Sequence, residues 1–321
     1  MQEREPPIYG NFHHYYGMRS ARAARQAQGT QASATVWEPQ PDGIDERIVA
    51  FLAWLQQNNA LKPIRVETIL DIGCNAAKPL LELCELLQPP PSYVLGVDID
   101  PVLIDQARTS LRMAWSQRQP DASSSSSVAA MRYFPRILAT KIGPLPLPPP
   151  HTPAFPLCMH FMAADWMQMP LKEGQYDLVL ALSLNKWIHL HHGDGGLLRF
   201  LARIAISLSC HGVFLWEMQP WSSYDQARSL SRELRAKHAQ LRVQPEDIPY
   251  ILDILGLSVH THIAQGMGHG FQRPLYVTRR PGQGTVHSAA TLVRDWAYVE
   301  DNFTWPWVAR NRSVRSRPRL A

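Results

Sequence analysis

Residues 183–196, SLNKWIHLHHGDGG, gather several side chains that could do chemistry. These side chains are Lys186, Trp187, His189, His191 and His192. Imidazole rings bind metal ions, and both imidazole and lysine donate hydrogen bonds to phosphates. The stretch also follows the apolar run 176–184, as the start of a helix does after a strand. A metal site, the edge of a catalytic site and a plain strand-to-helix connection are therefore three hypotheses for it.

The histidine spacing argues against a metal site. We expect His189, His191 and His192 on a loop at the end of a strand, where adjacent residues point apart, and the sequence holds no second ligand cluster. His189 is then predicted to donate a hydrogen bond, either to a phosphate or within the structure. His191 and His192 are expected at the surface or as loop caps, and Asp194 as a helix N-cap. Trp187 is either a stacking platform for a base or part of the core.

The elements that would position these residues alternate along the chain. Apolar runs typical of strands occupy residues 66–74, 92–100, 176–184, 212–220 and 273–280. Helical periodicity follows the first of these runs at 79–87 and the third at 196–209. Continuous apolar strands that alternate with amphipathic helices predict an α/β fold, with a mainly parallel sheet and helices on both of its faces.

Two segments have compositions that do not suit a packed core. Residues 116–153 contain a serine run and a proline run, so we predict a surface insertion that is largely flexible. After Asp301 the chain carries only basic charges, which predicts a solvated, disordered tail. Its charged residues are Arg310, Arg312, Arg315, Arg317 and Arg319.

The overall composition predicts a soluble intracellular protein with an anionic partner. The 321 residues are 45% hydrophobic, enough for one large domain or two small ones, and the net charge is +5. The cysteines show no CxxC spacing, so reduced thiols are expected rather than a disulfide framework or a zinc site. They are Cys74, Cys84, Cys158 and Cys210. The start, MQEREPPIYG, does not resemble a signal peptide, and no apolar run approaches the about 18 residues of a membrane span.

Polar residues at the ends of the first two strands predict a nucleoside pocket. In an open α/β sheet, ligands bind beyond the carboxyl ends of the strands. The first strand ends in LDIGCNAAKP, with Asp71 and the turn residue Gly73, and the second ends at Asp98, which is placed to accept hydrogen bonds from ribose hydroxyls. A dinucleotide needs GxGxxG for its pyrophosphate, whereas this turn has one glycine. The pocket therefore favours S-adenosylmethionine, which carries no pyrophosphate.

Several stretches together resemble the methylphosphate capping enzymes, the Bicoid-interacting type of RNA methyltransferase. They are YGNFHHYYGMR (9–19), LDIGCN (70–75), GVDIDPVLIDQAR (96–108), LSLNKWIHLHHGDGGLLRFL (182–201), EMQPWSSY (217–224) and GFQRPLYV (270–277). They occur in the order of the family. The resemblance implies a Rossmann-like class I fold that depends on S-adenosylmethionine. Residues 1–36 would then close over the cofactor and the RNA 5′ end, 37–282 would form the methyltransferase domain, and 283–321 would be a C-terminal extension with a basic tail.

The resemblance also implies roles for individual residues. Those that would line the cofactor are Tyr16, Arg19, Arg47, Gly73, Cys74, Asn75, Asp98, Ile99, Asp165, Trp166 and Leu182. Those that would meet the RNA 5′ end are Tyr15, Lys186, Phe271, Gln272 and Arg273. Of the polar groups, we predict that Tyr15, Lys186 and His189 are catalytic, and we add Trp187 to the RNA-binding residues.

Two positions depart from the family pattern. Ala77 stands where the family usually has a glycine, which would tighten the cofactor turn and weaken binding. Asn185 replaces the usual threonine before the lysine, which is the smaller change.

The activity implied by the resemblance is methyl transfer to the γ-phosphate at the 5′ end of a small nuclear or noncoding RNA, 7SK-like or spliceosomal. A phosphate oxygen is already anionic, so the enzyme needs in-line placement and hydrogen-bond donors rather than a general base. The nucleus is the expected location, and ribonucleoprotein components are possible further partners. Two alternatives remain open: methylation of a 5′-monophosphate on a small or transfer RNA, and a non-catalytic RNA-binding scaffold with the same fold.

Overall fold

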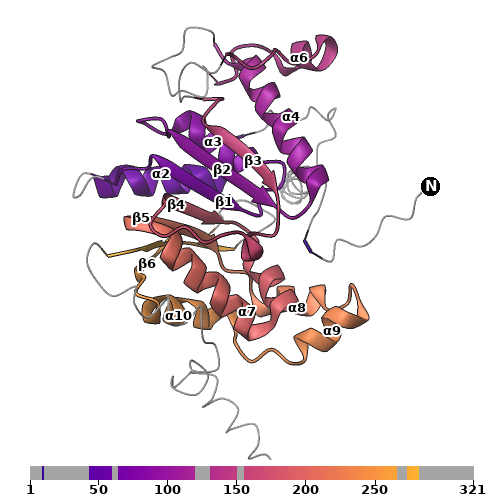
Figure 1. The fold of residues 1–321 in the computed structure, drawn as a ribbon, viewed down its shortest axis with the longest axis vertical. Helices are drawn as coiled ribbons and strands as arrows, with labels where there is room; N and C mark the ends of the chain where they lie inside the picture. The colour runs from indigo at the N-terminus through magenta and orange to yellow at the C-terminus, as the bar shows by residue number, and fades with distance from the viewer. Residues whose placement is uncertain are drawn as a thin grey trace, which may run out of the picture.

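The computed structural model describes residues 9–10, 43–59, 64–119, 131–149, 155–265 and 273–281. Their centre is a seven-stranded sheet in the order β3-β2-β1-β4-β5-β7-β6 (Figure 1). In chain order the strands are β1 Thr68–Ile72, β2 Tyr93–Asp98, β3 Met159–Ala163, β4 Tyr176–Ala181, β5 Leu208–Glu217, β6 Ser258–Gln265 and β7 Pro274–Arg279.

The sheet is parallel from β3 to β5, and β7 runs antiparallel to both β5 and β6. The chain moves outward from β1 to β2 and β3 and then returns to place β4 on the other side of β1. Strand order therefore reverses between β1 and β4, which is where open α/β sheets bind ligands at the carboxyl ends of their strands. The predicted fold class, a mainly parallel Rossmann-like sheet, is confirmed.

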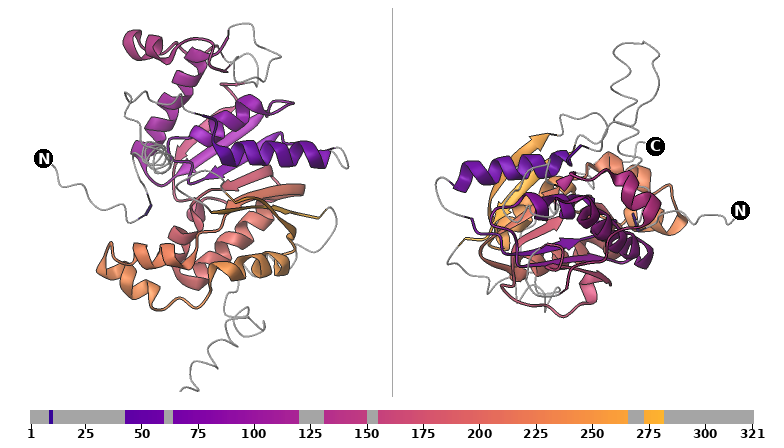
Figure 2. Two further views of the ribbon diagram at one scale, coloured as in Figure 1. Left: turned by 180° about the vertical axis from the view of Figure 1, so that it is seen from behind. Right: turned by 90° about the horizontal axis from the view of Figure 1, so that it is seen from above.

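Helices cover both faces of the sheet, as predicted (Figure 2). In chain order they are α2 Glu46–Asn59, α3 Lys78–Leu86, α4 Pro101–Gln117, α6 Arg136–Ile142, α7 Asn185–Ser207, α8 Trp221–Ala227, α9 Arg232–His238 and α10 Ile248–Ile254, with 3₁₀ turns at Trp166–Gln168 and Pro245–Asp247. The buried side chains of α2, α3 and α4 pack on one face, and those of α7 and α10 pack on the other. None of the described helices has the length and apolar character that a membrane span requires.

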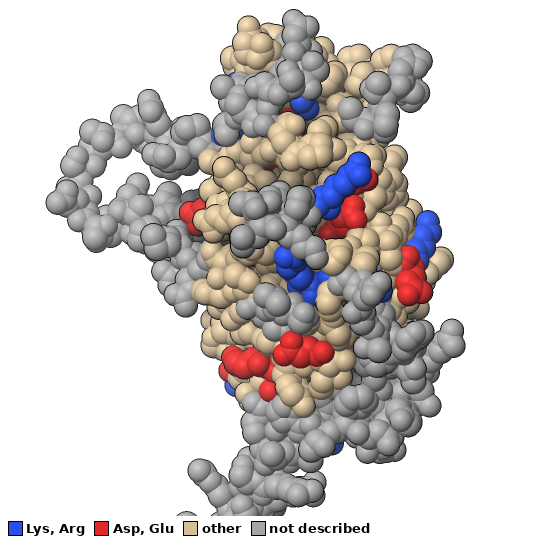
Figure 3. All heavy atoms as spheres, turned by 90° about the vertical axis from the view of Figure 1, so that its left-hand side faces the viewer, with Lys and Arg blue, Asp and Glu red and all other residues tan. Residues whose placement is uncertain are grey.

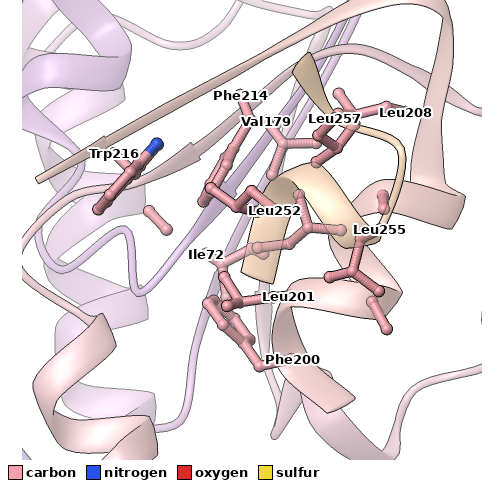
Figure 4. Packing of buried hydrophobic residues seen from close by; sticks show 14 of the residues in the cluster. Ile72, Val179, Phe200, Leu201, Leu208, Phe214, Trp216, Leu252, Leu255 and Leu257 are labelled. Carbon is pink, nitrogen blue, oxygen red and sulfur yellow. The ribbon is translucent and has the colours of Figure 1, made fainter. Parts of the chain in front are cut away.

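The face under α7 and α10 shows why these segments fold as they do (Figure 4). Phe200 and Leu201 of α7 and Leu252 of α10 meet Val179 and Phe214 of the sheet, and all five are 0% exposed. Burying one such side chain contributes about 1.5–3 kcal/mol. The helical spacing of the apolar residues in 196–209 thus places one continuous stripe against the sheet.

Two strands were not predicted from the sequence. β3 lies at one edge of the sheet and exposes several of its residues, and β6 lies at the other edge and is mostly polar in sequence. Neither has the continuous apolar character of a central strand, because an edge strand is not buried on all sides.

One further expectation needs correction, and a second concerns the insertion. The stretch around His189 is not a loop, because α7 begins at Asn185 and continues to Ser207 across a kink at Gly193, whose φ is +68°. The insertion 116–153 contains regular structure in its described part, since α4 extends to Gln117 and α6 packs against α4, and its flexibility stays a prediction. The Ser116 Oγ, for example, accepts a hydrogen bond from the Leu145 backbone N–H at 2.7 Å.

At the amino end of the sheet, Asp177 joins the first residues of three strands. Its Oδ2 accepts hydrogen bonds from the Glu67 N–H, the Thr68 N–H and the Thr68 hydroxyl, each at 3.0 Å. Its Oδ1 accepts the Ser209 hydroxyl at 2.6 Å. One carboxylate therefore fixes the starts of β1, β4 and β5 relative to one another.

We expect Asp177→Ala to lower the free energy of unfolding by about 2–4 kcal/mol, because several donors would lose a charged acceptor. Urea unfolding followed by circular dichroism measures the change. The control is Asp105→Ala, whose carboxylate is 75% exposed on α4 and pairs only with Arg108 in the described part of the chain. Equal unfolding midpoints for the two variants would contradict the role given to Asp177.

Candidate active site

The turn after β1 requires a glycine at its first position. Gly73 has a φ of +72°, and a Cβ there would lie 3.1 Å from the Leu184 side chain. The Gly73 and Cys74 N–H groups donate to the Val97 carbonyl at 2.8 and 3.1 Å. The turn therefore lies against both the end of β2 and the segment that leads into α7.

Asp98 lies at the end of β2, beside the turn that follows β1. Its Oδ2 accepts the Asn75 N–H at 2.9 Å and its Oδ1 accepts the Asp100 N–H at 3.0 Å. The side chain is buried, and burial raises its pKa, against the effect of these backbone hydrogen bonds. Each carboxylate oxygen can accept more than one hydrogen bond, so ribose hydroxyls can bind without displacing the backbone donors.

Ala77 takes up the backbone conformation that glycine favours. Its φ is +61°, it precedes α3, and its side chain is 0% exposed. A left-handed conformation costs a non-glycine residue about 1–2 kcal/mol. The turn therefore forms with alanine in the position where the family usually has glycine, and its methyl group packs in the core beneath α2, α3 and α4.

Other residues expected at the cofactor lie around the same turn. Ile99 is exposed at the tip of β2, and Leu182 is partly buried just after β4. The Ala164 N–H donates to the Asp98 carbonyl at 2.9 Å, which brings the neighbouring Asp165 to this edge of the sheet. Asp165 caps the 3₁₀ turn through the Met167 N–H at 2.9 Å.

The indole of Trp166 belongs to the core. It is buried, its ring packs edge-on against Phe200 with centroids 5.7 Å apart, and the guanidinium of Arg203 lies 4.9 Å from its centroid. Arg203 also donates to the Trp166 carbonyl at 2.9 Å. Any contact of Trp166 with an adenine ring would therefore come from its backbone in this conformation.

A buried network links four distant segments beside this pocket. The Ser183 hydroxyl donates to Glu217 Oε2 at 2.5 Å and accepts Arg273 Nη1 at 2.9 Å. Arg47 Nη1 donates to the same Glu217 oxygen at 3.2 Å, and its other nitrogens bind both oxygens of Asp45 at 2.8 Å. Arg47 and Arg273 were expected from the sequence, whereas the linking role of Ser183 was not. Its only sequence signal was its place directly after β4.

The network influences the acid at the end of β1. Asp71 is buried, which raises its pKa to about 7, although the Arg47 charge opposes the shift and the Asp98 charge adds to it. Arg47 is thus held by ion pairs with Asp45 and Glu217 close enough to Asp71 for its charge to act on that carboxyl. Its role as a cofactor ligand stays a prediction.

Lys186 lies at the start of α7 with its amine turned to α8. Its Nζ donates to the Ser223 hydroxyl at 2.9 Å and lies 4.5 Å from the Trp187 ring centroid. Burial lowers its pKa to about 8, and the nearby Arg273 charge adds to the effect. No carboxylate among the described residues forms an ion pair with it. Lys186 and Arg273 together therefore make a positive, partly dehydrated region.

Trp187 is buried, which favours the packing role over the stacking role. It lies in a cluster with Leu190, Tyr224, Ala227 and Leu234. The backbone of Gly10 lies against the Trp187 ring, because a Cβ added at Gly10 would fall 2.2 Å from the indole nitrogen.

The N-terminal part of the chain reaches this region at Tyr9 and Gly10. The Tyr9 ring stacks on His191, with centroids 4.4 Å apart. The predicted site residues Tyr15, Tyr16 and Arg19 lie outside the described residues, as do Phe271 and Gln272.

The surroundings of His189 favour the structural one of the two roles that the sequence left open. It is 0% exposed, its Nε2 lies 2.8 Å from Asp194 Oδ1, and its Nδ1 lies 3.3 Å from the Tyr224 hydroxyl. Since an ionised carboxylate can only accept, Nε2 carries the proton and donates to Asp194. Both ring nitrogens are thus engaged inside the protein, so the prediction of a catalytic His189 is not supported by its position.

Asp194 also differs from its expected role as an N-cap. Its Oδ2 accepts the Arg242 N–H at 3.0 Å, and its Oδ1 accepts the Val243 N–H at 3.2 Å. It therefore holds the segment after α9 against α7. Among the described residues, no group of three or more potential ligands gathers to hold a metal ion.

Comparison with known proteins finds that this chain is similar to RNA methyltransferases. The family model for Bicoid-interacting protein 3 (Bin3) matches residues 176–280. The chain is 30% identical over 298 residues to the 7SK snRNA methylphosphate capping enzyme of Homo sapiens, and the alignment covers 84% of this chain and 39% of that protein. It therefore spans less than half the length of the human relative. The resemblance noted in the sequence is confirmed.

Two further relatives differ in their named activities. A probable RNA methyltransferase of Arabidopsis thaliana is 29% identical over 217 residues, covering 64% of this chain and 68% of that protein. The pre-miRNA 5′-monophosphate methyltransferase of Xenopus laevis is 30% identical over 173 residues, covering 52% of this chain and 54% of that protein.

We expect His189→Ala to lower the free energy of unfolding by about 2–4 kcal/mol, because it would remove the imidazole that bonds to Asp194 and to the buried Tyr224 hydroxyl and leave a cavity in the interior. Thermal and urea unfolding measure the change. The control is His192→Ala, an exposed residue on the same helix, for which a change within about 0.5 kcal/mol is expected. If His189→Ala lost activity at unchanged stability, the residue would be catalytic rather than structural.

Proposed function

The chain carries a Bicoid-interacting protein 3 domain over residues 176–280, and on this premise we propose that it is an S-adenosylmethionine-dependent RNA methyltransferase. The proposed product is a methyl ester on the γ-phosphate at the 5′ end of a small nuclear or noncoding RNA. The observation that carries the proposal is Lys186, a buried amine at the carboxyl edge of the sheet that has no carboxylate partner in the described structure.

The residues at the end of β1 and β2 fit the cofactor. The bare backbone of Gly73 keeps the turn open beside Leu184, and the Asp98 carboxylate has hydrogen-bonding capacity beyond its two backbone donors. Asp98 would hold the ribose hydroxyls, and Gly73 with Asn75 would provide the close backbone approach. Bound S-adenosylmethionine would supply an activated methyl group on a sulfonium centre.

The cationic residues fit the other reactant. A phosphate oxygen is anionic at neutral pH, so it can attack the methyl carbon without a base, and a neutral thioether leaves. Lys186 and Arg273 would hold the phosphates through charge-assisted hydrogen bonds and orient one oxygen for in-line attack. Tyr15, Phe271 and Gln272 are proposed to complete the RNA end of the site, as the family resemblance implies.

A triphosphate end is the preferred substrate, and a 5′-monophosphate is the second candidate. The preference rests on YYGMR and FQRP, which resemble the triphosphate-directed branch, and on the relative that aligns with 84% of the chain. The second candidate is favoured by relatives named for 5′-monophosphate methylation, which align with shorter parts of the chain. The small nuclear RNAs named for other relatives favour a nuclear location and ribonucleoprotein partners.

A radiolabelled methyl transfer assay on matched RNAs tests the choice. One RNA sequence is prepared with a 5′-triphosphate, a 5′-monophosphate and a 5′-hydroxyl end. We expect label on the triphosphate RNA, released with the terminal phosphate by a pyrophosphohydrolase. Label confined to the monophosphate RNA would establish the second candidate, and label on none of the three would contradict the proposed function.

We expect Asp98→Ala to weaken S-adenosylmethionine binding by about 10- to 100-fold, since two hydrogen bonds to a charged acceptor would be lost. Isothermal titration calorimetry measures the affinity. Asp98→Asn keeps the size of the side chain and an oxygen that can accept the Asn75 N–H. It therefore separates loss of the ligand contact from collapse of the turn at Asn75. Unchanged affinity in both variants would contradict the pocket.

We expect Lys186→Ala to lower kcat/KM by about 100-fold, as loss of a preorganised donor does. Because burial sets the Lys186 pKa to about 8, the protonated form that holds phosphate prevails below that pH, and kcat/KM should decline above it. Lys186→Arg is the matched control, since arginine keeps its charge and should remove the decline. The same decline in Lys186→Arg would show that another group titrates.

A further inference from the structure

The segment that contains α8 and α9 concentrates much of the positive charge of the described chain. Residues 221–242 contain five lysine and arginine residues and two acidic residues. The two acidic residues are already paired, Asp225 with Arg228 at 3.6 Å and Glu233 with Lys237 at 2.7 Å. The excess charge therefore resides on Arg232, Arg235 and Arg242, which we call the arginine ridge.

The arginine ridge is exposed and serves no packing role in the described structure. All three residues are exposed, and none of them forms an ion pair with a described carboxylate. Arg232 and Arg235 are three residues apart on α9, a spacing that places both on one side of a helix. Leu234 instead lies on the inward side of α9, where it is buried in the same hydrophobic cluster as Trp187.

The arginine ridge is fixed to the candidate active site by short contacts. Lys186 reaches the Ser223 hydroxyl in the first turn of α8 at 2.9 Å. His189 contacts Tyr224 of α8 on one side and Asp194 on the other, and Asp194 accepts the backbone N–H of Arg242. The phosphate-facing amine and the ridge are therefore parts of one rigid assembly around the start of α7.

The face of the molecule on the left-hand side of Figure 1 carries mixed charge. Figure 1 shows α9 at the right, and Figure 3 views the molecule from the left-hand side of Figure 1. On that face, blue and red side chains lie next to one another in the described part of the surface. α8 and α9 carry both signs as well, and the three arginines of the ridge differ from their neighbours Arg228 and Lys237 in forming no ion pair with a described carboxylate.

We propose that the arginine ridge binds the sugar–phosphate backbone of the RNA next to its 5′ end. This inference rests on the proposed function and extends it from the terminal phosphates to the body of the substrate. Exposed arginines bind phosphate oxygens without reading sequence, and the release of counterions makes the binding sensitive to salt. The ridge would lower KM for longer RNAs and leave the chemistry at Lys186 unchanged.

The test compares wild type with the triple variant Arg232→Gln, Arg235→Gln, Arg242→Gln on two substrates. One is a trinucleotide with a 5′-triphosphate, and the other is a hairpin RNA of about 30 nucleotides with the same 5′ end. We expect KM for the hairpin to rise by about tenfold at about 0.15 M salt, and the slope of log KM against log salt to fall by about 2. Rates on the trinucleotide should match wild type.

The control removes the same charge elsewhere, with Arg112→Gln, Arg136→Gln and Lys141→Gln on α4 and α6, at the opposite end of the molecule from α9 (Figure 1). It should leave both substrates unaffected. An unchanged KM for the hairpin in the ridge variant would overturn the proposal and leave an acidic protein as the partner to consider. An equal loss on both substrates, or an equal loss in the control, would also overturn it.

Fluorescence anisotropy with the labelled hairpin and no methyl donor separates this inference from the proposed function. One outcome is that no RNA is methylated but the ridge variant binds the hairpin about tenfold more weakly than wild type. This would support RNA binding by the arginine ridge and contradict the proposed methyltransferase activity. The opposite outcome is that the hairpin is methylated and both proteins bind it equally. This would support the proposed activity and contradict RNA binding by the arginine ridge.

Discussion

The buried carboxylate of Glu217 is the interaction on which the candidate site depends. It is 1% exposed, and it accepts the Ser183 hydroxyl and the Arg47 guanidinium, while Ser183 in turn accepts Arg273. A buried charge is costly unless it is paired, and a buried ion pair adds little net stability. The effect of the network is therefore to fix geometry. It sets the end of β4, the end of β5 and the entry to β7 relative to the first turn of α2.

The first turns of α7 hold a residue of the candidate site, Lys186, and a residue bonded within the interior, His189, only three positions apart. Lys186 and His189 both contact α8, through Ser223 and Tyr224 respectively. Lys186 keeps its amine at the edge of the positive region, whereas His189 lies in the interior with both nitrogens bonded. The helix thereby connects the amine that would meet phosphate with the segment that carries the arginine ridge.

The turn after β1 stores backbone strain at the place where a cofactor would bind. Gly73, Asn75 and Ala77 all have positive φ values, of 72°, 52° and 61°. Such strain persists only where surrounding contacts determine the conformation, and it is common at functional sites. Here the Asp98 carboxylate holds the Asn75 N–H, and the core holds the Ala77 methyl group.

The sequence by itself determined the central strands, the helix α3, the second part of α7 and the ends of β1 and β2. Long apolar runs are buried on both sides in a parallel sheet, so β1, β2, β4 and β5 were recognisable from local pattern alone. The positions of Gly73, Asp98 and Lys186 near the carboxyl ends of strands followed from the same local pattern, and their roles stay predictions. The edge strands β3 and β6 were not, because exposure on one side removes the apolar signal.

Only the tertiary structure decided which residues bond to His189 and which ion pairs form. His189 obtains its role from Tyr224 and Asp194, and Glu217 obtains its role from Arg47 and Ser183. Most of these partners lie more than thirty positions apart in the chain. Local sequence carries no information on such pairs, since they form only when the sheet brings the carboxyl ends of β4 and β5 together and packing buries the groups between them.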